Sequence, residues 1–398
     1  MSCDDTTTPL PALDLAYLEE TLLQLLAIPS PVGLTDAIVR YVAARLDALG
    51  IPYEITRRGA IRATLKGRER RPARAIVAHL DTLGAMVREL QDNGRVGVVP
   101  IGTWSSRFAE GGRLTLFTDS QQIRGTCLPL MTSGHAFGDA INSQPNSWDH
   151  VEVRLDLPVN NKQELQEAGV SVGDWIAFDP QPEVQPGGYI NARYLDDKAS
   201  VAVLLTACKA LVEHGVDLPV DVHPLFTITE EVGSGASAAL HGDIAEMVSL
   251  DIAIAAPGQA TDERSVTICL QDLSGPFDYH LSHKLIGLAR RHGIAHRRDV
   301  FKFYRSDSAA AVEAGNDIRT ALIGFGADAS HAQERTHIDS LRALGHLSMA
   351  YLMSEPVARR DRQSMGSIEG FTEQLKPEEM QVNTTALPDP PDFLDAKD

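Results

Sequence analysis

The sequence predicts an α/β protein in which helices flank a mixed sheet and a small β-barrel-like domain is inserted. Short, wholly apolar runs such as residues 75–78 are typical of strands buried on both faces of a sheet. Longer segments with apolar residues at helical spacing alternate with these runs. Between about residues 90 and 187 the chain changes to short alternating segments rich in Gly, Thr, Ser and Val, which favours a β-barrel.

The first part of the predicted α/β domain is residues 11–89, and it begins with two helices. Leucines recur at helical spacing over 14–27 and predict the first helix. A second helix is expected over 37–49, and Gly50 is the expected residue beyond its end. The apolar run at 75–78 then predicts a buried strand.

Residues 90–187 are predicted to form the inserted β-rich domain. Apolar and polar residues alternate at 113–117 and 151–155, as in antiparallel strands with one buried face. One short helix is expected over 162–168. The candidate site residues lie on both sides of this region, so we interpret it as an insertion into one catalytic domain.

The second part of the α/β domain is predicted over residues 188–355. Helices are expected over 198–214 and about 282–291. Three further apolar runs predict strands at 220–229, 248–255 and 320–325. The tail, 356–398, is acidic and contains several prolines but few apolar residues, a composition that predicts a flexible segment.

Composition excludes several classes of protein. The 398 residues carry a formal charge of −18, which argues against nucleic acid or an anionic membrane as partner. No stretch is long and apolar enough for a membrane span, and the amino-terminal segment does not resemble a signal peptide, so cytoplasmic location is expected. The four cysteines contain no Cys-x-x-Cys pair and predict neither a cysteine zinc site nor a disulfide framework.

Five side chains that can bind divalent metals stand at the ends of predicted strands or beside them. Two histidines and three carboxylates suit two adjacent ions when one carboxylate bridges them. A further glutamate, Glu230, stands beside one of these ligands and is a candidate base for a metal-bound water. The five candidate ligands are His79, Asp196, Glu231, Asp251 and His331.

The first ligand has a predicted partner close by in the sequence. His79 and Asp81 stand at i and i+2 after an apolar strand, so their side chains point to the same side of an extended segment. Asp81 could then accept the second ring N–H of His79 and orient the imidazole. The alternative is a surface turn in which neither residue binds a metal.

The paired aspartates leave a choice open. Asp196 and Asp197 precede a predicted helix, where either carboxylate could cap the first amides. We expect one of them to cap and assign the bridging position to Asp196. Lys198 is expected to offset surplus negative charge nearby.

The next acidic residues also call for a cation. Glu230 and Glu231 follow an apolar strand, and two buried acids would repel each other unless a cation lay between them. Because neighbours on an extended backbone point to opposite sides, one can ligate while the other faces substrate and water; a solvated pair is the alternative. Asp251 interrupts an apolar run, where an unpaired carboxylate would be costly.

The last ligand is the second open choice. His331 follows the predicted strand 320–325 after a short loop, whereas His337 falls within or near the next helix. We therefore favour His331 as the ligand.

Taken together and in this order, the motifs resemble the dinuclear zinc aminopeptidases of the tetrahedral, glutamyl and deblocking aminopeptidase type. The resemblance covers roughly residues 14–353. Its motifs are Ile28-Pro-Ser-Pro-Val-Gly33, His79-x-Asp81-x-x-Gly84, Asp196-Asp197-Lys198, Glu230-Glu231-Val-Gly-Ser-Gly235 and Ser306-Asp307-Ser308-Ala309. It implies a zinc-exopeptidase-like catalytic domain, an inserted β-domain used in assembly, and homo-oligomers that are often dodecamers.

The resemblance also implies how the ligands divide between two ions. His79 and Asp251 hold one ion, Glu231 and His331 hold the other, and Asp196 bridges them. The expected ions are zinc, with cobalt or manganese as alternatives.

The remaining roles follow from the same resemblance. Glu230 is the expected general base, Asp81 orients His79, and Asp307 lies near the substrate. The chain also departs from the family: Lys198 stands where arginine is usual, and Asp328-Ala-Ser-His331-Ala replaces an Arg-Tyr-x-His-Ser motif that shapes the substrate pocket. In this respect it resembles a divergent branch that accompanies bacterial synthesis of the osmoprotectant N-acetylglutaminylglutamine amide.

The sequence thus predicts a dinuclear-metal hydrolase that cleaves amide bonds of peptides or small peptide-like substrates as an aminopeptidase. Glu230 is expected to assist the attack of a metal-bridging water. Two alternatives remain: a carboxypeptidase or deacylase of the related dinuclear zinc hydrolases, and a non-catalytic assembly protein on the same fold.

Overall fold

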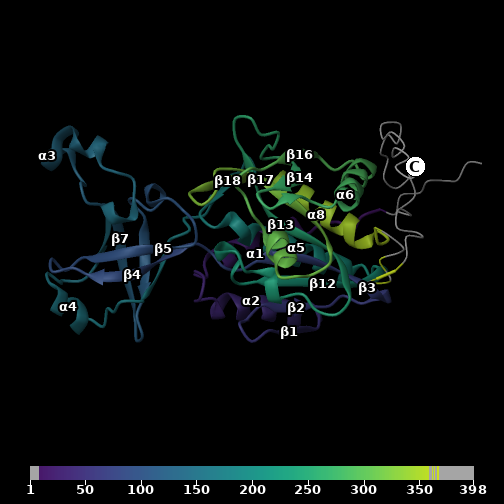
Figure 1. The fold of residues 1–398 in the computed structure, drawn as a ribbon, viewed down its shortest axis with the longest axis horizontal. Coiled ribbons are helices and arrows are strands. Elements are labelled where there is room, and N and C mark those ends of the chain that lie inside the picture. The colour runs from purple at the N-terminus through teal and green to yellow at the C-terminus, as the bar shows by residue number, and fades with distance from the viewer. Residues whose placement is uncertain (1–8, 358–360, 362, 364, 367–398) are drawn as a thin grey trace, which may run out of the picture.

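The computed structural model describes residues 9–357, 361, 363 and 365–366, so the predicted flexible tail, 356–398, lies almost wholly outside the described residues. A large α/β body and a smaller β-barrel lie next to each other along the long axis of the molecule (Figure 1). Within the described part of the chain, no helix combines the length and apolar character that crossing a membrane requires.

A mixed, 12-stranded sheet forms the centre of the large body, as predicted. Its central strands run parallel in the order β12 (Leu218–Thr227), β3 (Gly67–His79), β13 (Ile244–Ala255) and β17 (Arg319–Asp328). Antiparallel strands extend both edges: β1 (Tyr53–Ile55), β2 (Ile61–Ala63), β18 (Glu334–His337), β11 (Tyr189–Ala192) and β10 (Glu183–Val184). Strand β14 (Val266–Asp272) pairs with β17 and also with β15 (Gly275–Pro276) and β16 (His296–Val300).

The central strands are longer than their apolar runs suggest. Strand β3 extends well before the buried run at 75–78, because its polar first half continues to pair with β12. Side chains from 75 to 78 are almost fully buried, as expected for a strand covered on both faces.

The helices lie close to the predicted segments. Three of them pack in one layer, in which α5 (Leu195–Glu213) contacts both α1 (Leu15–Leu26) and α8 (Ile338–Met353) and also covers β3 and β13. The others are α2 (Asp36–Ala48), α6 (Tyr279–Arg291) and α7 (Asp307–Glu313). Asp196 and Asp197 have non-helical backbone angles, so the regular part of α5 begins near the predicted residue 198.

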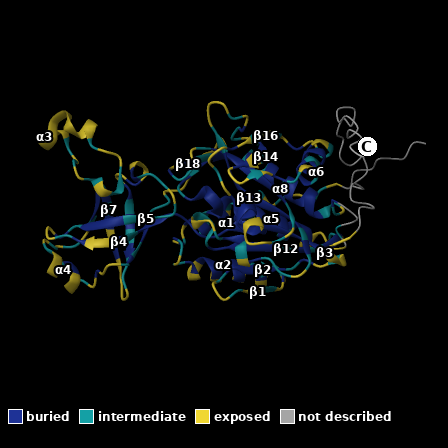
Figure 2. Cartoon of the chain, viewed as in Figure 1, coloured by how far each residue is buried: buried dark blue, intermediate teal, exposed yellow. Residues whose placement is uncertain are grey.

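The smaller body is a closed barrel with the strand order β4-β5-β8-β7-β6-β9. Its strands are β4 (Gly84–Leu90), β5 (Val96–Ile101), β6 (Arg113–Phe117), β7 (Gln122–Pro129), β8 (Val151–Leu155) and β9 (Trp175–Phe178). The first strand therefore starts before residue 90. Helix α4 (Lys162–Glu167) and the short helix α3 (Gly134–Phe137) lie at its periphery, and the segment around α3 projects as a largely exposed arm (Figure 2).

Tryptophan side chains fix the barrel against the α/β body. The Trp175 indole donates a hydrogen bond to the Val32 carbonyl at 3.0 Å. Gly33, with φ +89°, packs against the same indole, where an added Cβ would lie 3.3 Å from the ring. On the other side, Phe178 donates its amide to the Tyr194 hydroxyl at 3.2 Å. These contacts hold the barrel loops in place beside the end of strand β3.

A buried ion pair fastens the end of α8 to the start of the central sheet. The Arg74 guanidinium lies 2.9 Å from Glu246 Oε1, and both side chains are almost fully buried. Arg74 also donates to the carbonyls of Tyr351 and Leu352, while Glu246 accepts the Val357 amide at 3.0 Å. Burial raises the pKa of Glu246, but the Arg74 charge outweighs it and holds that pKa below its ordinary value.

We predict that Glu246→Gln strongly destabilises the α/β body, because it leaves the Arg74 charge buried without a counter-charge. Breaking such a pair costs about 3–5 kcal/mol. Since the folded-state pKa of Glu246 is depressed, its contribution is present at neutral pH and is lost as the pH falls below about 4. Urea unfolding at pH 7 and at pH 3.5 measures both effects.

The matched control is Asp156→Asn, which removes the exposed pair between Arg113 and Asp156. Such surface pairs contribute at most about 1 kcal/mol. Equal unfolding midpoints for the two variants at pH 7 would contradict the prediction.

Candidate functional site

The candidate site lies where the parallel strands of the sheet end. His79 is the last residue of β3, and Asp251 lies in the second half of β13. Glu230 and Glu231 follow β12 in the 3-10 turn η4 (Glu230–Val232), and His331 follows β17. Because carboxyl ends of parallel strands share one edge, these side chains converge there. The start of α5 brings Asp196 to the same edge.

His79 is held so that one ring nitrogen faces the cluster. Its Nδ1 lies 2.9 Å from the Asp81 carbonyl oxygen, which can only accept, so Nδ1 carries a hydrogen. In the neutral imidazole, Nε2 then presents its lone pair to Asp196 Oδ1 at 3.1 Å. Two acceptors at this separation repel each other unless a proton or a cation lies between them. Ligand atoms on a tetrahedral zinc ion are about 3.3 Å apart.

His331 repeats this arrangement. Its Nδ1 lies 2.8 Å from the Thr103 carbonyl, which belongs to the barrel, and its Nε2 lies 3.3 Å from Glu231 Oε2 and 3.5 Å from Asp196 Oδ2. His337, the alternative, is instead the N-cap of α8 and contacts the Gly187 carbonyl at 2.9 Å. The structure thus brings His331 and not His337 to the cluster.

Asp196 lies between the two histidines, and Asp197 lies behind them. Asp197 Oδ2 accepts the His79 amide at 3.1 Å, and its Oδ1 is buried without a hydrogen-bond partner among the described residues. Two groups of described side chains each bring ligand atoms within 4.8 Å of one another, and Asp196 is common to both. The groups are His79, Asp196 and Glu231, and Asp196, Asp197 and Asp251.

The electrostatics of the cluster favour divalent cations. Burial raises the pKa of Glu231 to about 8 and lifts that of Asp251 well above its ordinary value. Burial also acts on Asp196, but hydrogen bonds from His331 and His79 lower its pKa. Glu231 Oε1 is buried and has no hydrogen-bond partner in the described chain. Closely packed carboxylates cannot all ionise without positive charge among them, so these residues fit divalent metal.

The structure corrects the predicted role of the Asp81 side chain. Its carboxylate is 3.8 Å from His79 Nδ1, and its backbone carbonyl accepts the ring hydrogen instead. The carboxylate accepts the amides of Glu230 at 3.2 Å and Glu231 at 3.1 Å. The reason is that strand β3 ends at His79, so the extended geometry that would align residues 79 and 81 is lost. Asp81 therefore positions both glutamates through their backbone.

The structure also differs from the expected placement of Asp307. Its carboxylate is buried and accepts the Thr227 hydroxyl and the Ala236 amide, each at 2.6 Å. Gly235 passes so close that an added Cβ would lie 2.0 Å from Asp307 Oδ1. Asp307 therefore anchors the glycine-rich loop after β12 rather than facing the cleft, and the preceding residue, Ser306, lines the cleft instead.

Lys198 does not offset the carboxylates as expected. Its ammonium donates to the Ile28 carbonyl at 2.6 Å, and burial lowers its pKa to about 7. The helix begins at this residue, so the side chain points back toward the loop after α1. It secures that loop rather than the metal cluster.

Glu334 supports two of the predicted ligands and was not found by sequence reasoning. Its buried carboxylate accepts the amide of His331 at 3.0 Å and that of Asp196 at 3.0 Å. His331 has φ +58°, a left-handed conformation that costs a non-glycine residue about 1–2 kcal/mol. The hydrogen bond to Glu334 offsets this cost. A glutamate three residues after the histidine was the only signal in the sequence.

Tyr304 is a second residue that the sequence did not reveal. Its hydroxyl is buried beside the Asp251 carboxylate and has no other hydrogen-bond partner within the described chain. Burial, together with the charges of Asp251 and Asp196, raises its pKa well above the ordinary value, which places the hydroxyl beside the carboxylates. Tyr304 stands two residues before the motif at residues 306–309, but nothing in that motif indicated a tyrosine at the site.

A cleft of about 1460 Å³ opens at the cluster and is lined by Asp196, Glu230, Asp251, Tyr304 and His331, among others. The site therefore has room for a ligand much larger than a single amino acid.

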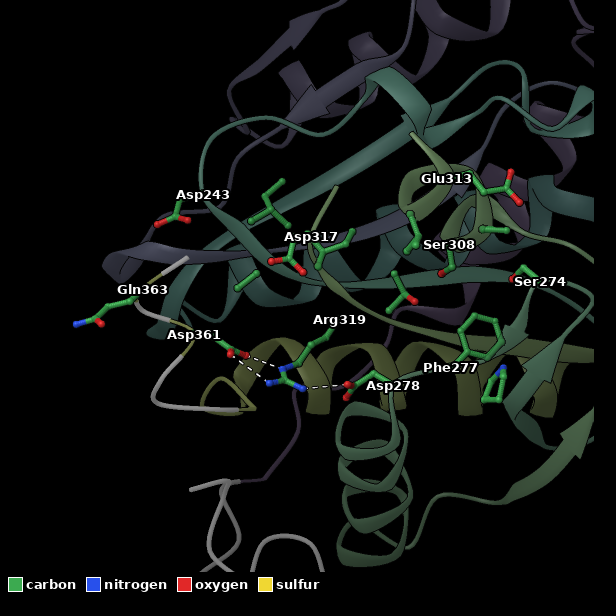
Figure 3. Close-up of a pocket in the computed structure, with 17 residues that line it drawn as sticks. Asp243, Ser274, Phe277, Asp278, Ser308, Glu313, Asp317, Arg319, Asp361 and Gln363 are labelled. Carbon is green, nitrogen blue, oxygen red and sulfur yellow. Dashed lines mark hydrogen bonds and ion pairs between the residues drawn. The ribbon is translucent and has the colours of Figure 1, made fainter. Parts of the chain in front are cut away.

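A separate cavity of about 580 Å³ lies at the other ends of β13 and β17 (Figure 3). There Arg319 is held by Asp278 at 2.9 Å and Asp361 at 2.7 Å. Asp243 and Asp317 also line it, but none of the candidate ligands does. Its one arginine is engaged by carboxylates, so the predicted chemistry belongs to the larger cleft.

Comparisons with known proteins match this geometry. The family model described as M42 glutamyl aminopeptidase matches residues 59–347. YhfE of Bacillus subtilis (strain 168), an aminopeptidase candidate, is 39% identical over 339 residues, covering 85% of this chain and 98% of that protein.

Solved structures share the fold. The aminopeptidase APDkam598 from the archaeon Desulfurococcus kamchatkensis superposes with a TM-score of 0.78 at 21% identity, covering 89% of this chain and 99% of that one. The TET1 peptidase of Pyrococcus horikoshii superposes with a TM-score of 0.75 at 22% identity, covering 85% and 100%.

We predict that Asp81→Asn lowers the affinity for divalent metal by about 10- to 100-fold, the usual effect of losing a group that orients ligands. Asparagine keeps one acceptor oxygen, so the amides of Glu230 and Glu231 can no longer both be bound. Competition with a chromophoric chelator measures the affinity, with the exposed Asp119→Asn as control. Unchanged affinity in Asp81→Asn would show that the two amide contacts are dispensable.

Proposed function

The chain belongs to the M42 glutamyl aminopeptidase family and is a metal-dependent aminopeptidase, and on that premise we propose that it removes amino-terminal residues from peptides at the cluster around Asp196. The observation that carries the proposal is the orientation of the two histidines. Each donates Nδ1–H to a backbone carbonyl and directs Nε2 at the same aspartate.

We assign His79 and Asp251 to one ion, Glu231 and His331 to a second, and Asp196 to a position between them. The two overlapping ligand groups that share Asp196 support its central position. The division of the other four ligands follows the family resemblance. When bound, such ions would lower the pKa of a water at the site and polarise the scissile carbonyl. Zinc suits the mixed nitrogen and oxygen donors, and cobalt or manganese are the alternatives.

Glu230 is proposed as the general base. Its carboxylate is 3.9 Å from His79 Nε2 and lines the cleft, and its backbone is fixed by Asp81. Burial raises its pKa well above the ordinary value, which improves a carboxylate as a proton acceptor near neutral pH. It takes a proton from the attacking water and gives it to the leaving amine.

Tyr304 is proposed to donate its hydroxyl hydrogen to the reacting carbonyl oxygen. The hydroxyl lies beside Asp251 at the cleft and has no other hydrogen-bond partner among the described residues. A fixed donor aimed at an oxygen that gains charge stabilises the transition state more than the ground state.

We also infer that the chain forms a homo-oligomer through contacts of its barrel domain. The boundaries of that domain, 90–187, remain our proposal. In support, the Pyrococcus horikoshii TET1 peptidase can assemble into a tetrahedron or a large octahedral shell. The arm around α3 exposes Leu130, Phe137 and Ile141, side chains that suit a protein contact.

Whether the substrate has a free or an acylated amino terminus distinguishes an aminopeptidase from the related deacylases. A free amino terminus should be required, so N-acetylated peptides should be poor substrates while the matching free peptides are hydrolysed. The link to N-acetylglutaminylglutamine amide and the cytoplasmic location stay predictions.

We predict that Glu230→Gln retains its bound metal but loses at least about 100-fold in kcat, the scale of general-base catalysis. Glutamine keeps the shape of the side chain but cannot take a proton. Metal analysis and peptide hydrolysis on the same sample test it, with the exposed Glu110→Gln as control. Normal turnover by metal-loaded Glu230→Gln would remove this residue from the mechanism.

We predict that Tyr304→Phe lowers kcat by about 10²- to 10³-fold, as loss of a donor to the reacting oxygen does, while metal content and KM change little. A peptide phosphonate that mimics the tetrahedral state should bind more weakly in proportion. The control is Tyr53→Phe, which removes a peripheral hydrogen bond to Asp47. If Tyr304→Phe loses metal instead, the hydroxyl serves to hold Asp251 and not the substrate.

A further inference from the structure

We propose that a basic and aromatic wall of the cleft, residues 298–305, binds the free carboxylate of short peptide substrates, so that the enzyme selects short peptides with an unmodified carboxyl terminus. This inference rests on the proposed function and adds the class of substrate. We call these eight residues the basic strip.

The composition of the basic strip contrasts with that of the chain. Its sequence, Arg-Asp-Val-Phe-Lys-Phe-Tyr-Arg, contains three cationic and three aromatic residues but one acid, in a protein of net charge −18. All eight residues line the cleft that contains Glu230, Asp251 and His331. One wall of the substrate cleft is thus locally basic in an acidic protein.

The cations of the basic strip are available to a ligand. Arg298 and Lys302 are exposed and form no ion pair among the described residues, whereas Arg305 pairs with Glu313 at 2.6 Å. The one acid, Asp299, forms no ion pair with them among the described residues, and its Oδ2 accepts the amides of Ala260 at 2.8 Å and Thr261 at 2.9 Å. Two positive side chains therefore remain to meet an anion.

The conformation of the basic strip is fixed by neighbouring strands. Its first residues belong to β16, which pairs with β14, and the Leu273 amide donates to the Tyr304 carbonyl at 2.9 Å. The Phe301 and Tyr304 rings pack together with centroids 5.6 Å apart. Tyr304 thus stands at the carboxylate cluster while Lys302 and Phe303, the latter 93% exposed, stand at the mouth of the cleft.

The lining of the cleft can then accommodate a short peptide from end to end. The amino end reaches the catalytic cluster, where bound metal ions would offset the carboxylates, cations lie at the mouth, and apolar side chains of Ile254, Leu270 and Leu273 line the space with them. A short peptide can place its amine at the cluster and its carboxylate at Arg298 and Lys302. Amidation removes that charge, and a longer peptide carries it beyond the basic strip.

The test compares a matched pair of peptides, Leu-Gly-Gly and its carboxamide, on the zinc-loaded full-length enzyme. Exposed charge pairs each change affinity by up to about fivefold, so kcat/KM for the acid should exceed that for the amide by about five- to tenfold at low salt. The ratio should approach one in the double variant Arg298→Ala with Lys302→Ala, and it should also fall as salt is added.

The matched control is Arg297→Ala. Arg297 is the neighbouring arginine, but it pairs with Asp262 at 2.6 Å and does not line the cleft, so this variant should keep the wild-type ratio. Equal rates for acid and amide in the wild type, or an undiminished ratio in the double variant, would overturn the inference.

Leucine p-nitroanilide, which has no carboxylate, separates this inference from the proposed function. If the enzyme hydrolyses leucine p-nitroanilide but cleaves the peptide acid and its amide equally well, the proposed aminopeptidase function is supported. The role of the basic strip is then refuted. If no substrate is hydrolysed, calorimetry of the same two peptides on zinc-loaded Glu230→Gln still decides the point. Tighter binding of the acid supports the inference, and equal binding refutes it.

Discussion

The site depends on one constraint: several carboxylates are buried together at the carboxyl edge of the parallel sheet. Their mutual repulsion and desolvation would disfavour the fold unless cations or protons offset them. The surrounding hydrogen bonds fix the backbone of the ligands instead of neutralising their charge. Asp81 binds the amides of Glu230 and Glu231, and Glu334 binds those of Asp196 and His331. The fold thus preserves a negatively charged pocket, which is what a divalent metal requires.

The barrel takes part in the same site. The carbonyl that orients His331 belongs to Thr103, and Gly102 lies so close to Leu83 that an added Cβ would be 2.4 Å from its Cδ2. The Trp175 contact with Val32 keeps this loop in register with the end of β3. If the chain assembles through its barrel and His331 binds metal, as proposed, the subunit contacts would lie only a few bonds from that histidine.

Sequence reasoning found the elements that depend on local pattern. Apolar periodicity predicted the main helices and the central strands, because burial on one or both faces leaves a regular signal. The family was indicated separately, by the order of the short motifs that carry the candidate ligands. Sequence reasoning could not predict partners that loops bring from elsewhere. The Asp81 carboxylate turns away because β3 ends at His79, and Asp307 is drawn into the glycine-rich loop by Thr227 and Ala236. Tyr304 enters the site from a position just before the motif at residues 306–309, which gives no sign of it.

The charge distribution explains why the basic strip would select by length rather than simply attract anions. The chain carries a net charge of −18, so an approaching anion is repelled at long range. At physiological ionic strength, however, fields between exposed charges fade over about 8 Å. Arg298 and Lys302 can therefore act only on a carboxylate already inside the cleft. A substrate gains from both ends when its amine reaches the cluster around Asp196 while its carboxylate reaches these two side chains. The distance from the cluster around Asp196 to the basic strip would therefore set the length of peptide that the enzyme prefers.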